Sequence, residues 1–379
     1  MRQEPPMRIQ EIKTHVVVQK LETQFGMSQW LWNSRASCLL EIITDDGVIG
    51  WGECFGPAQA NAALIKELYS PLLIGQDPLQ RARLWENLYN RTREFGRKGI
   101  AISALSGIDI ALWDIVGKAL GQPIATLLGG ATDEPVKAYA SSFYYSADDR
   151  YSLEKDAQVS VQHGFQAFKM KVGGMTPRQD AARVAEVRRL IGPDASLAVD
   201  SNRAYTVREA IQFGKSIEEY DISWFEEPVL PDDFQGYREV RGALNMRIAG
   251  GESEFTRFGF RPFLEQRCVD IVQPDVAACG GLSEALNIAM LASAHGVDCF
   301  PHLWGSAISL AATLHLISSI PLAVPSCVKE RPLLELDRAP NVFREQLSDL
   351  VIGPFIPVPD KPGLGIEIDR DLIRHYEQN

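Results

Sequence analysis

The feature that most constrains the fold of this chain is a regular alternation of short apolar segments and helical segments that begins near residue 131. Eight segments have the length and composition of strands, the last being the weakest, and they cover residues 136–143, 167–172, 197–202, 223–228, 247–253, 270–275, 297–302 and 333–337. Stretches of about ten to fifteen residues with helical spacing separate them. This alternation predicts βαβ units and a parallel sheet. Eight such strands fit a compact TIM-type barrel.

The first third of the chain has a different pattern. Residues 7–52 alternate apolar and polar side chains, and Asp45-Asp46-Gly47 separates two apolar runs, which indicates a β-hairpin. Residues 60–120 then show helical spacing, with Leu105 and Ile108 on one face of a segment that ends at Gly121. We therefore expect an α+β domain at residues 1–130, a barrel at 131–345 and a C-terminal tail at 346–379 that returns to the first domain.

Composition and charge exclude several functional classes. The chain has 379 residues, of which 45% are hydrophobic and 23% charged, as in an ordinary globular protein. A net charge of −11 without a dense Lys/Arg cluster argues against nucleic-acid binding. No apolar run is long enough for a membrane span, and the start of the chain lacks the apolar stretch of a secretory signal, which favours a cytoplasmic protein. The six cysteines form no CxxC pair and are expected to be mostly buried thiols.

Three carboxylates follow successive barrel strands. Asp200, Glu226 and Glu252 are spaced 26 residues apart, which is about one βα unit each. Because active sites of TIM barrels form at the carboxyl ends of the strands, we expect the three to converge on one point. Three converging carboxylates repel one another, whereas a hard cation such as Mg²⁺ needs such oxygen ligands. The pattern favours one magnesium site per subunit over three separate solvated acids.

Two lysines lie on the strand before Asp200. Lys169 and Lys171 are two residues apart, so both point to the same face of the strand. If that face is the barrel interior, each ammonium group is expected to lower the pKa of the other, which would suit one of the two lysines to act as a base near neutral pH. An exposed strand face with two solvated lysines is the alternative.

Three further groups extend the predicted site. His302 follows Asp275 by one βα unit, and an imidazole beside a carboxylate is a candidate general acid or base. Glu335 on the last strand is expected to hold a developing oxyanion if it remains protonated, although an ion pair at the barrel rim is nearly as plausible from spacing alone. Asn202, two residues beyond Asp200, is included among the candidate catalytic residues.

An α+β domain followed by Lys-x-Lys, Asp-x-Asn, Glu-Glu-Pro, Gly-Glu, Pro-Asp and Pro-His at strand ends resembles the enolase superfamily and, within it, the mandelate racemase subgroup. The resemblance covers nearly the whole chain. It implies a modified (β/α)7β barrel with an N-terminal capping domain. It also implies that Asp200, Glu226 and Glu252 bind Mg²⁺, that Lys171 and His302 act on opposite faces of a carboxylate substrate, and that the protein is a homo-oligomer.

The resemblance further implies abstraction of the proton α to the carboxylate of an acid sugar, giving an enediolate. Ring-opening β-elimination of an aldarolactone, a cycloisomerase reaction, is the leading expectation. Dehydration of a linear acid sugar by the same residues and racemisation of a 2-hydroxy acid are the alternatives. A barrel that only binds a carboxylate ligand, and an aldolase that forms a Schiff base, remain as readings of other classes.

Contacts to the substrate from the first domain are less constrained by the sequence. The candidates come from two segments that are able to close over the barrel mouth, and they are Trp30, Trp32, Cys54 and Phe55. Each is equally well explained as packing between the domains.

Overall fold

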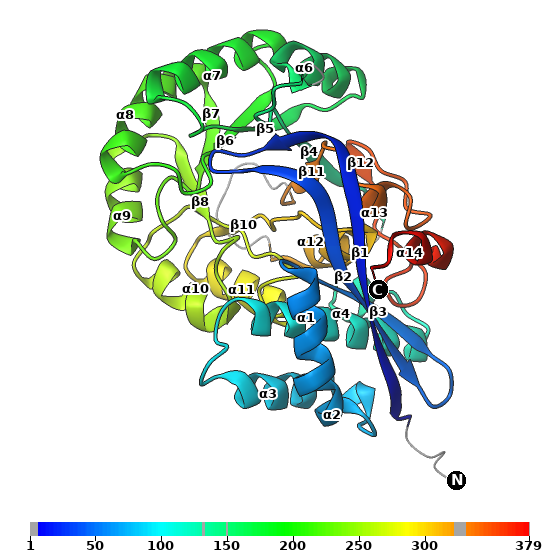
Figure 1. Cartoon of the computed structure of the whole chain (residues 1–379). Coiled ribbons are helices and arrows are strands. Elements are labelled where there is room, and N and C mark those ends of the chain that lie inside the picture. Colours follow the sequence, from blue (N-terminus) through cyan, green and yellow to red (C-terminus); the bar gives the residue numbers. More distant parts are fainter. Residues whose placement is uncertain (1–6, 131–132, 149–150, 322–330, 379) are drawn as a thin grey trace.

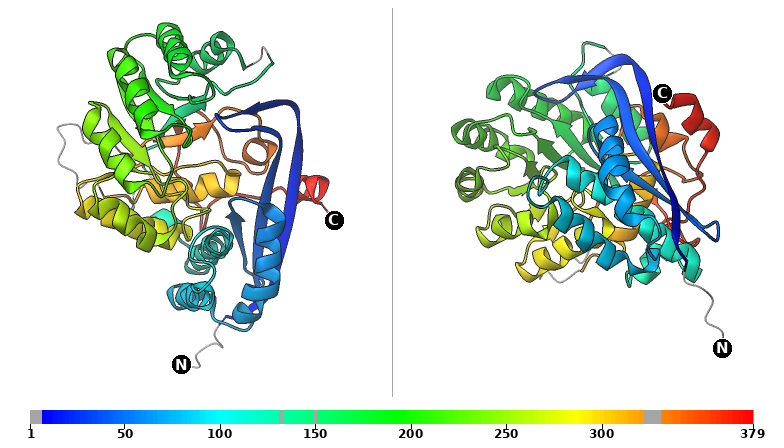
Figure 2. Two further views of the ribbon diagram at one scale, coloured as in Figure 1. Left: turned by 60° about the vertical axis from the view of Figure 1, so that its left-hand side comes forward. Right: turned by 60° about the horizontal axis from the view of Figure 1, so that its bottom comes forward.

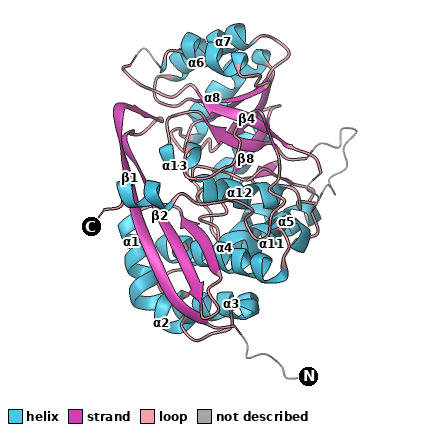
Figure 3. Cartoon of the chain, turned by 90° about the vertical axis from the view of Figure 1, so that its right-hand side faces the viewer, coloured by secondary structure: helices cyan, strands magenta, loops and turns pink. Residues whose placement is uncertain are grey.

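The computed structural model describes residues 7–130, 133–148, 151–321 and 331–378 and contains two sheets. The first is an antiparallel sheet of β1 (Ile9–Gly26), β2 (Leu31–Thr44) and β3 (Ile49–Cys54), in the order β1-β2-β3. The turn between β2 and β3 contains Gly47, whose φ of 86° suits glycine, so the predicted hairpin is present. Figure 3 shows this sheet apart from the barrel strands, with helices on one side of it.

The helices of the first domain cover the sheet, and one of them, α4, is the longest helix of the described chain. They are α1 (Ala58–Leu64), the π-helix Ile65–Tyr69, α2 (Ser70–Leu73), the short 3₁₀-helix Pro78–Gln80, α3 (Arg81–Thr92), α4 (Ile100–Leu120) and α5 (Ile124–Leu127). Helix α4 ends at Gly121 in the left-handed conformation, as predicted. It is long and apolar enough to cross a membrane, but 94% of its apolar window is buried inside the protein, where it packs against β3 and α11 (Gly281–Ala294).

Eight parallel strands form the second sheet, in the order β10-β9-β8-β7-β6-β5-β4-β11. They are β4 (Val136–Ser142), β5 (Ala167–Lys171), β6 (Ser196–Asp200), β7 (Ile222–Glu226), β8 (Arg247–Gly250), β9 (Ile271–Val272), β10 (Asp298–Cys299) and β11 (Leu334–Asp337). All eight predicted strand segments are therefore strands, and the modified barrel is confirmed. The short strand β12 (Phe355–Ile356) adds to β4 in the antiparallel direction.

An outer ring of helices surrounds these strands (Figure 1). Its members are α6 (Leu153–Gln162), α7 (Pro177–Ile191), α8 (Val207–Ile217) with the 3₁₀-helix Glu218–Tyr220, α9 (Phe234–Ala243), α10 (Thr256–Glu265), α11 and α12 (Ala307–Ile317). Their apolar faces and the outward side chains of the strands form one continuous core, which includes Phe168, Phe225 and Ile248. The core holds the carboxyl ends of the strands at one mouth.

The C-terminal tail leaves the barrel through α13 (Val342–Glu345) and ends in α14 (Arg370–Tyr376), which packs against β1. Figure 2 shows α14 beside the long arch of β1 and β2. Gln378 donates its backbone N–H to the Val16 carbonyl oxygen at 2.8 Å. The domain boundaries stay a prediction, and residue 131 lies outside the described residues. The five cysteines in the described ranges are buried free thiols, while Cys327 falls in an undescribed range.

Candidate active site

Three carboxylates meet at the mouth of the barrel. Asp200 and Glu226 are the last residues of β6 and β7, and Glu252 follows β8 by two residues. One oxygen atom from each carboxylate can be chosen so that all lie within 4.8 Å of one another. The parallel register aligns Asp200 directly with Glu226, so the spacing of 26 residues places the side chains together as expected.

The two lysines of β5 are buried and point into the barrel, each against a carboxylate. Lys171 Nζ lies 2.5 Å from Asp200 Oδ2, and Lys169 Nζ lies 2.6 Å from Glu226 Oε1. Burial lowers the pKa of Lys171, but the carboxylates, Asp200 first, outweigh burial and the neighbouring Lys169, and the net pKa is raised. The expectation that mutual repulsion brings the pKa of one lysine near neutral is therefore wrong for this arrangement, because the pKa of both lysines is raised by acidic groups that the sequence spacing did not count.

Glu335 takes part in an ion pair in place of the predicted neutral acid. Its Oε1 atom lies 2.8 Å from Lys169 Nζ. Burial raises the pKa of Glu335, but the charges of Lys169 and His302 outweigh burial and lower the pKa overall. The lowered pKa favours the ionised carboxyl group, so the structure supports the ion pair, the alternative left open by the sequence, over the protonated acid.

His302 lies on the other side of the carboxylate cluster, three residues beyond the end of β10. Its Nδ1 atom is 2.7 Å from Asp275 Oδ2, and its Nε2 atom is 3.3 Å from Glu252 Oε2. Burial lowers the pKa of His302, whereas Glu252 and Asp275 raise it more strongly, to about 10. The hydrogen bond from Nδ1 to Asp275 fixes the orientation of the imidazolium, and Nε2 faces the charge of Glu252.

The carboxylate cluster has the composition of a Mg²⁺ site. All three side chains offer oxygen, the ligand type that Mg²⁺ prefers. Glu252 Oε2 is buried and lacks hydrogen-bond geometry to any described residue, despite its distance of 3.3 Å from His302, and Asn202 Oδ1 is likewise without a partner among the described residues. Buried oxygens left without donors beside three carboxylates fit a bound divalent cation.

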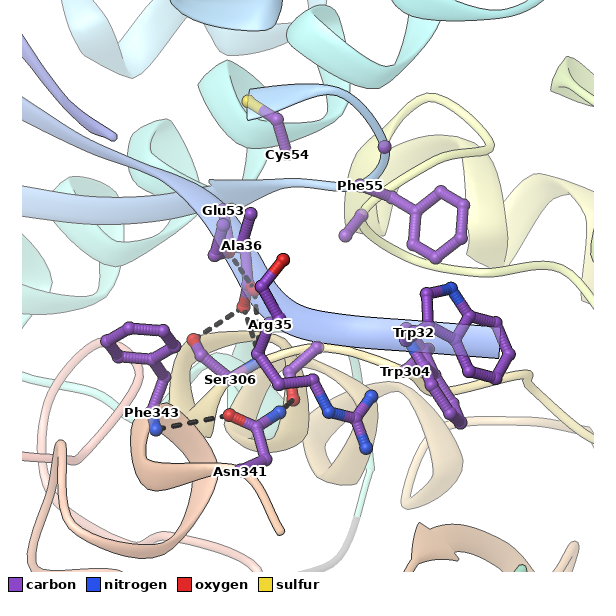
Figure 4. Close-up of a pocket in the computed structure, with 15 residues that line it drawn as sticks. Trp32, Arg35, Ala36, Glu53, Cys54, Phe55, Trp304, Ser306, Asn341 and Phe343 are labelled. Carbon is purple, nitrogen blue, oxygen red and sulfur yellow. Dashed lines mark hydrogen bonds between the residues drawn. The ribbon is translucent and has the colours of Figure 1, made fainter. Parts of the chain in front are cut away.

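A chamber of about 300 Å³ opens above the cluster, between the two domains. Its lining includes Lys171 and His302 together with the predicted contacts Trp30, Trp32 and Phe55. Cys54 does not line this chamber, and its Sγ atom lies 4.0 Å from the Ala104 carbonyl oxygen of α4. Cys54 lines a second, neighbouring pocket together with Trp32 and Trp304, and Figure 4 shows its sulfur turned away from that pocket. Cys54 is a core residue of the first domain, because alternation along β3 directs it to the helices.

The tip of the β1–β2 arch closes over the barrel and binds to its main chain. Ser28 Oγ donates to the Ser201 carbonyl oxygen at 2.8 Å, and Gln29 Nε2 donates to the Asn202 carbonyl oxygen at 2.7 Å. Gly26 and Tyr145 exchange two backbone hydrogen bonds, at 2.8 and 2.9 Å. These contacts place Trp30 and Trp32 at the chamber.

Several residues of the site were not found from the sequence. Arg203 bridges Glu227 at 2.8 Å and Glu252 at 3.2 Å, Gln273 Nε2 donates to Glu226 Oε2 at 2.6 Å, and Trp304 packs on Trp32 with 5.0 Å between ring centroids. Arg203 and Gln273 lie within three residues of predicted site residues at strand ends, so their position along the chain was the available signal.

Comparisons with known proteins agree with the observed fold. The family described as mandelate racemase / muconate lactonizing enzyme, N-terminal domain, matches residues 11–129, and the family described as enolase C-terminal domain-like matches residues 152–372. D-galactarolactone cycloisomerase from Agrobacterium fabrum is 42% identical over 378 residues, which are 98% of this chain and 99% of that protein. Arabinonate dehydratase from Saccharolobus solfataricus is 36% identical over 340 residues, 89% of each chain.

A solved structure gives the same result in three dimensions. The 3,6-anhydro-D-galactonate cycloisomerase from Zobellia galactanivorans superimposes with a TM-score of 0.87 at 37% identity, over 98% of this chain and 100% of that one. Both domains thus match along their length. The chain belongs to the enolase superfamily and, within it, to the mandelate racemase and muconate lactonizing enzyme family.

Proposed function

We propose that this protein removes the proton α to the carboxylate of a sugar acid in a Mg²⁺-dependent reaction, and that its substrate is an aldarolactone of the D-galactaro-1,4-lactone type. The observation that carries the proposal is the placement of three carboxylates between Lys171 and His302 at one chamber. The reactions named for the similar cycloisomerases support ring opening as the outcome.

Asp200, Glu226 and Glu252 would hold the cation. When bound, Mg²⁺ would supply positive charge for the substrate carboxylate and for the additional charge that forms on it as the proton leaves. Lys169 is buried beside the cluster and adds a fixed cation at the same place. The chain thereby concentrates positive charge where the enediolate develops.

Lys171 and His302 are the proposed acid/base pair. They come from β5 and from the segment after β10, with strands β6 to β9 between them, and both line the chamber. Either side chain can act as a base only after it loses a proton, because both pKa values are raised. Neutralising the charge of Asp200 lowers the pKa of Lys171, since Asp200 is the neighbour that raises it most.

Ring opening consumes no water in this scheme. The bond from the α carbon to hydrogen breaks, a carbon–carbon double bond forms to the β carbon, and the bond from the β carbon to the lactone oxygen breaks. The lactone carbonyl group leaves as a carboxylate, and the resulting enol tautomerises to a keto-deoxy acid. The chamber walls, with Trp30, Trp32 and Phe55, hold the ring during these steps.

The test is NMR spectroscopy in D₂O with Mg²⁺, using a panel of aldarolactones, aldarates and aldonates. A keto-deoxy product from a lactone, but not from its linear acid, is the expected result. We expect Lys171→Ala and His302→Asn to abolish the product while Mg²⁺ still binds, as measured by calorimetry. Full activity in both variants would contradict the mechanism.

Dehydration of a linear acid sugar is the second candidate. The 36% identity with a protein named arabinonate dehydratase favours it, because the same abstraction step serves both reactions. Product from a linear aldonate or aldarate in the NMR panel would replace the cycloisomerase assignment with this one.

A further inference from the structure

The first domain contributes a buried carboxylate that contacts the barrel. Glu53, in β3, is 2% exposed. Its oxygens accept hydrogen bonds from Ser37 Oγ at 2.5 Å and Ser306 Oγ at 2.6 Å, and from the backbone N–H groups of Ser306 at 2.9 Å and Ser309 at 3.0 Å. Figure 4 shows Glu53 directed to Ser306 across the boundary between the sheet and the barrel.

Glu53 has no cationic partner within ion-pair distance in the described ranges. A buried carboxylate without a counter-ion is costly, and a neutral side chain would avoid that cost. The donors that compensate it include backbone N–H groups in the first turn of α12, where the helix carries partial positive charge. The side chain therefore acts as an N-terminal cap that one domain supplies to a helix of the other.

Helix α12 begins directly after the segment that carries His302 and Trp304. Ser306, the N-cap residue of α12, follows His302 by four positions. Directly after β3, Phe55 donates its N–H to the carbonyl oxygen of Ala277, two residues beyond Asp275, at 3.0 Å. The Phe55 ring lies edge-on to His302, with 6.0 Å between the ring centroids. Residues 53–55 thus contact both chain segments that hold the His302–Asp275 pair.

We propose that Glu53 is a positioning residue, which fixes the start of α12 and through it the orientation of His302 and Trp304 at the chamber. The inference rests on the proposed function, because the proposed function makes His302 one of the two acid/base residues. It assigns to Glu53 no contact with substrate. Loss of the carboxylate charge is expected to loosen the segment 302–309 and to slow the chemical step.

The first experiment compares Glu53→Gln with Glu41→Gln by hydrogen–deuterium exchange and mass spectrometry. Glu41 is a matched control, because it is a buried carboxylate of the same sheet that pairs with His15 and Arg370, on the side of the C-terminal tail. In Glu53→Gln the amide nitrogen meets N–H and O–H donors. We expect peptides covering residues 302–309 to exchange about tenfold faster or more in Glu53→Gln and to stay unchanged in Glu41→Gln.

The second measurement is turnover on the substrate found in the NMR panel. We expect Glu53→Gln to lower kcat about ten- to hundredfold with KM within about threefold, because a misplaced acid/base group affects the reacting geometry more than binding. Glu41→Gln is expected to keep the wild-type kcat. Equal kcat values in the two variants, or faster exchange without a loss of kcat, would overturn the inference.

A milder pair of variants covers the case in which Glu53→Gln does not fold. Ser306→Ala removes one donor to Glu53, whereas Ser309→Ala removes a buried hydroxyl that has no hydrogen-bond partner in the described chain. Only Ser306→Ala is expected to raise exchange in the 302–309 segment and lower kcat. The exchange measurement needs no substrate. Unchanged exchange in both Ser306→Ala and Glu53→Gln would therefore refute the inference even if every lactone in the panel is inert. Inert lactones by themselves count against the proposed function only.

Discussion

Lys169 is enclosed by acidic groups, and its role depends on how they are charged. Glu226 and Glu335 both lie within 2.8 Å of its ammonium nitrogen. From the sequence, Glu335 was expected to act as a neutral acid that donates a hydrogen bond to an oxyanion. In the structure Glu335 is an ion-pair partner of Lys169. Under the proposed function, the donor to the substrate carboxylate would then be the ammonium group, which Glu335 orients.

Glu335→Gln distinguishes these two roles. A neutral acid is replaced by an amide with little loss, because both donate a hydrogen bond. An amide does not replace an ionised partner of Lys169 in this way, because it carries no charge. We then expect kcat to fall about ten- to hundredfold, which corresponds to the loss of one charge-assisted hydrogen bond. Steady-state kinetics, with circular dichroism as a control for folding, measures the effect. A kcat within about twofold of wild type would support the neutral acid.

Two barrel helices begin with a capping box, a motif formed by residues close together in the sequence. Thr176 and Gln179 cap α7, and Thr206 and Glu209 cap α8, each with the threonine hydroxyl and the acidic or amide side chain bonded to the other's backbone. Helix α8 starts just beyond the loop that follows Asp200 and carries Asn202. Its cap therefore fixes both the helix and one end of a loop of the site.

We expect Thr206→Ala to lower the free energy of unfolding by about 1 kcal/mol, because an orphan N–H group of α8 loses its acceptor. Urea denaturation followed by circular dichroism gives the value. Thr206→Ser keeps the hydroxyl and is the matched control, for which a change well below that of alanine is expected. The same loss in both variants would show that the methyl group, and not the cap, carries the contribution.

The elements that were predicted well are those with a local signal. Strand positions follow from runs such as 167–172, and the convergence of Asp200 and Glu226 follows from the regular length of a βα unit. The ionisation of Glu335 and Lys171 could not be predicted, because it depends on distances between strands. Cys54 was misplaced for a similar reason, since the sequence does not say which face of β3 meets α4.

At the scale of the whole molecule, the C-terminal tail joins the two ends of the chain. Arg370 Nη2 donates to Glu41 Oε2 at 2.6 Å, and His15 lies between Glu41 Oε1 at 2.8 Å and Glu377 Oε1 at 2.7 Å. The hydrogen bond to Glu41 raises the pKa of His15 most, burial offsets part of this effect, and Glu377 raises the pKa further. The first strand and the last helix thus share one titratable link.

This link predicts a pH dependence of stability. The folded pKa of His15 is raised above its unfolded value of 6.5, so its contribution is complete below that pH and is lost as pH rises through the folded pKa. We expect a loss of at most about 1 kcal/mol, because the group is partly exposed. Thermal unfolding at about pH 5.5 and about pH 8.5, in wild type and His15→Gln, measures it. An identical pH dependence in both proteins would contradict the prediction.

Ser28 and Gln29 fasten the arch of β1 and β2 to main-chain carbonyl groups at positions 201 and 202. Every amino acid presents the same carbonyl, so mutations in the barrel loop leave these anchors in place. Trp30 and Trp32, which line the chamber, are then free to vary between fixed points. Under the proposed function, a lineage can exchange the two tryptophans and acquire a new sugar acid while the residues for proton abstraction are inherited unchanged.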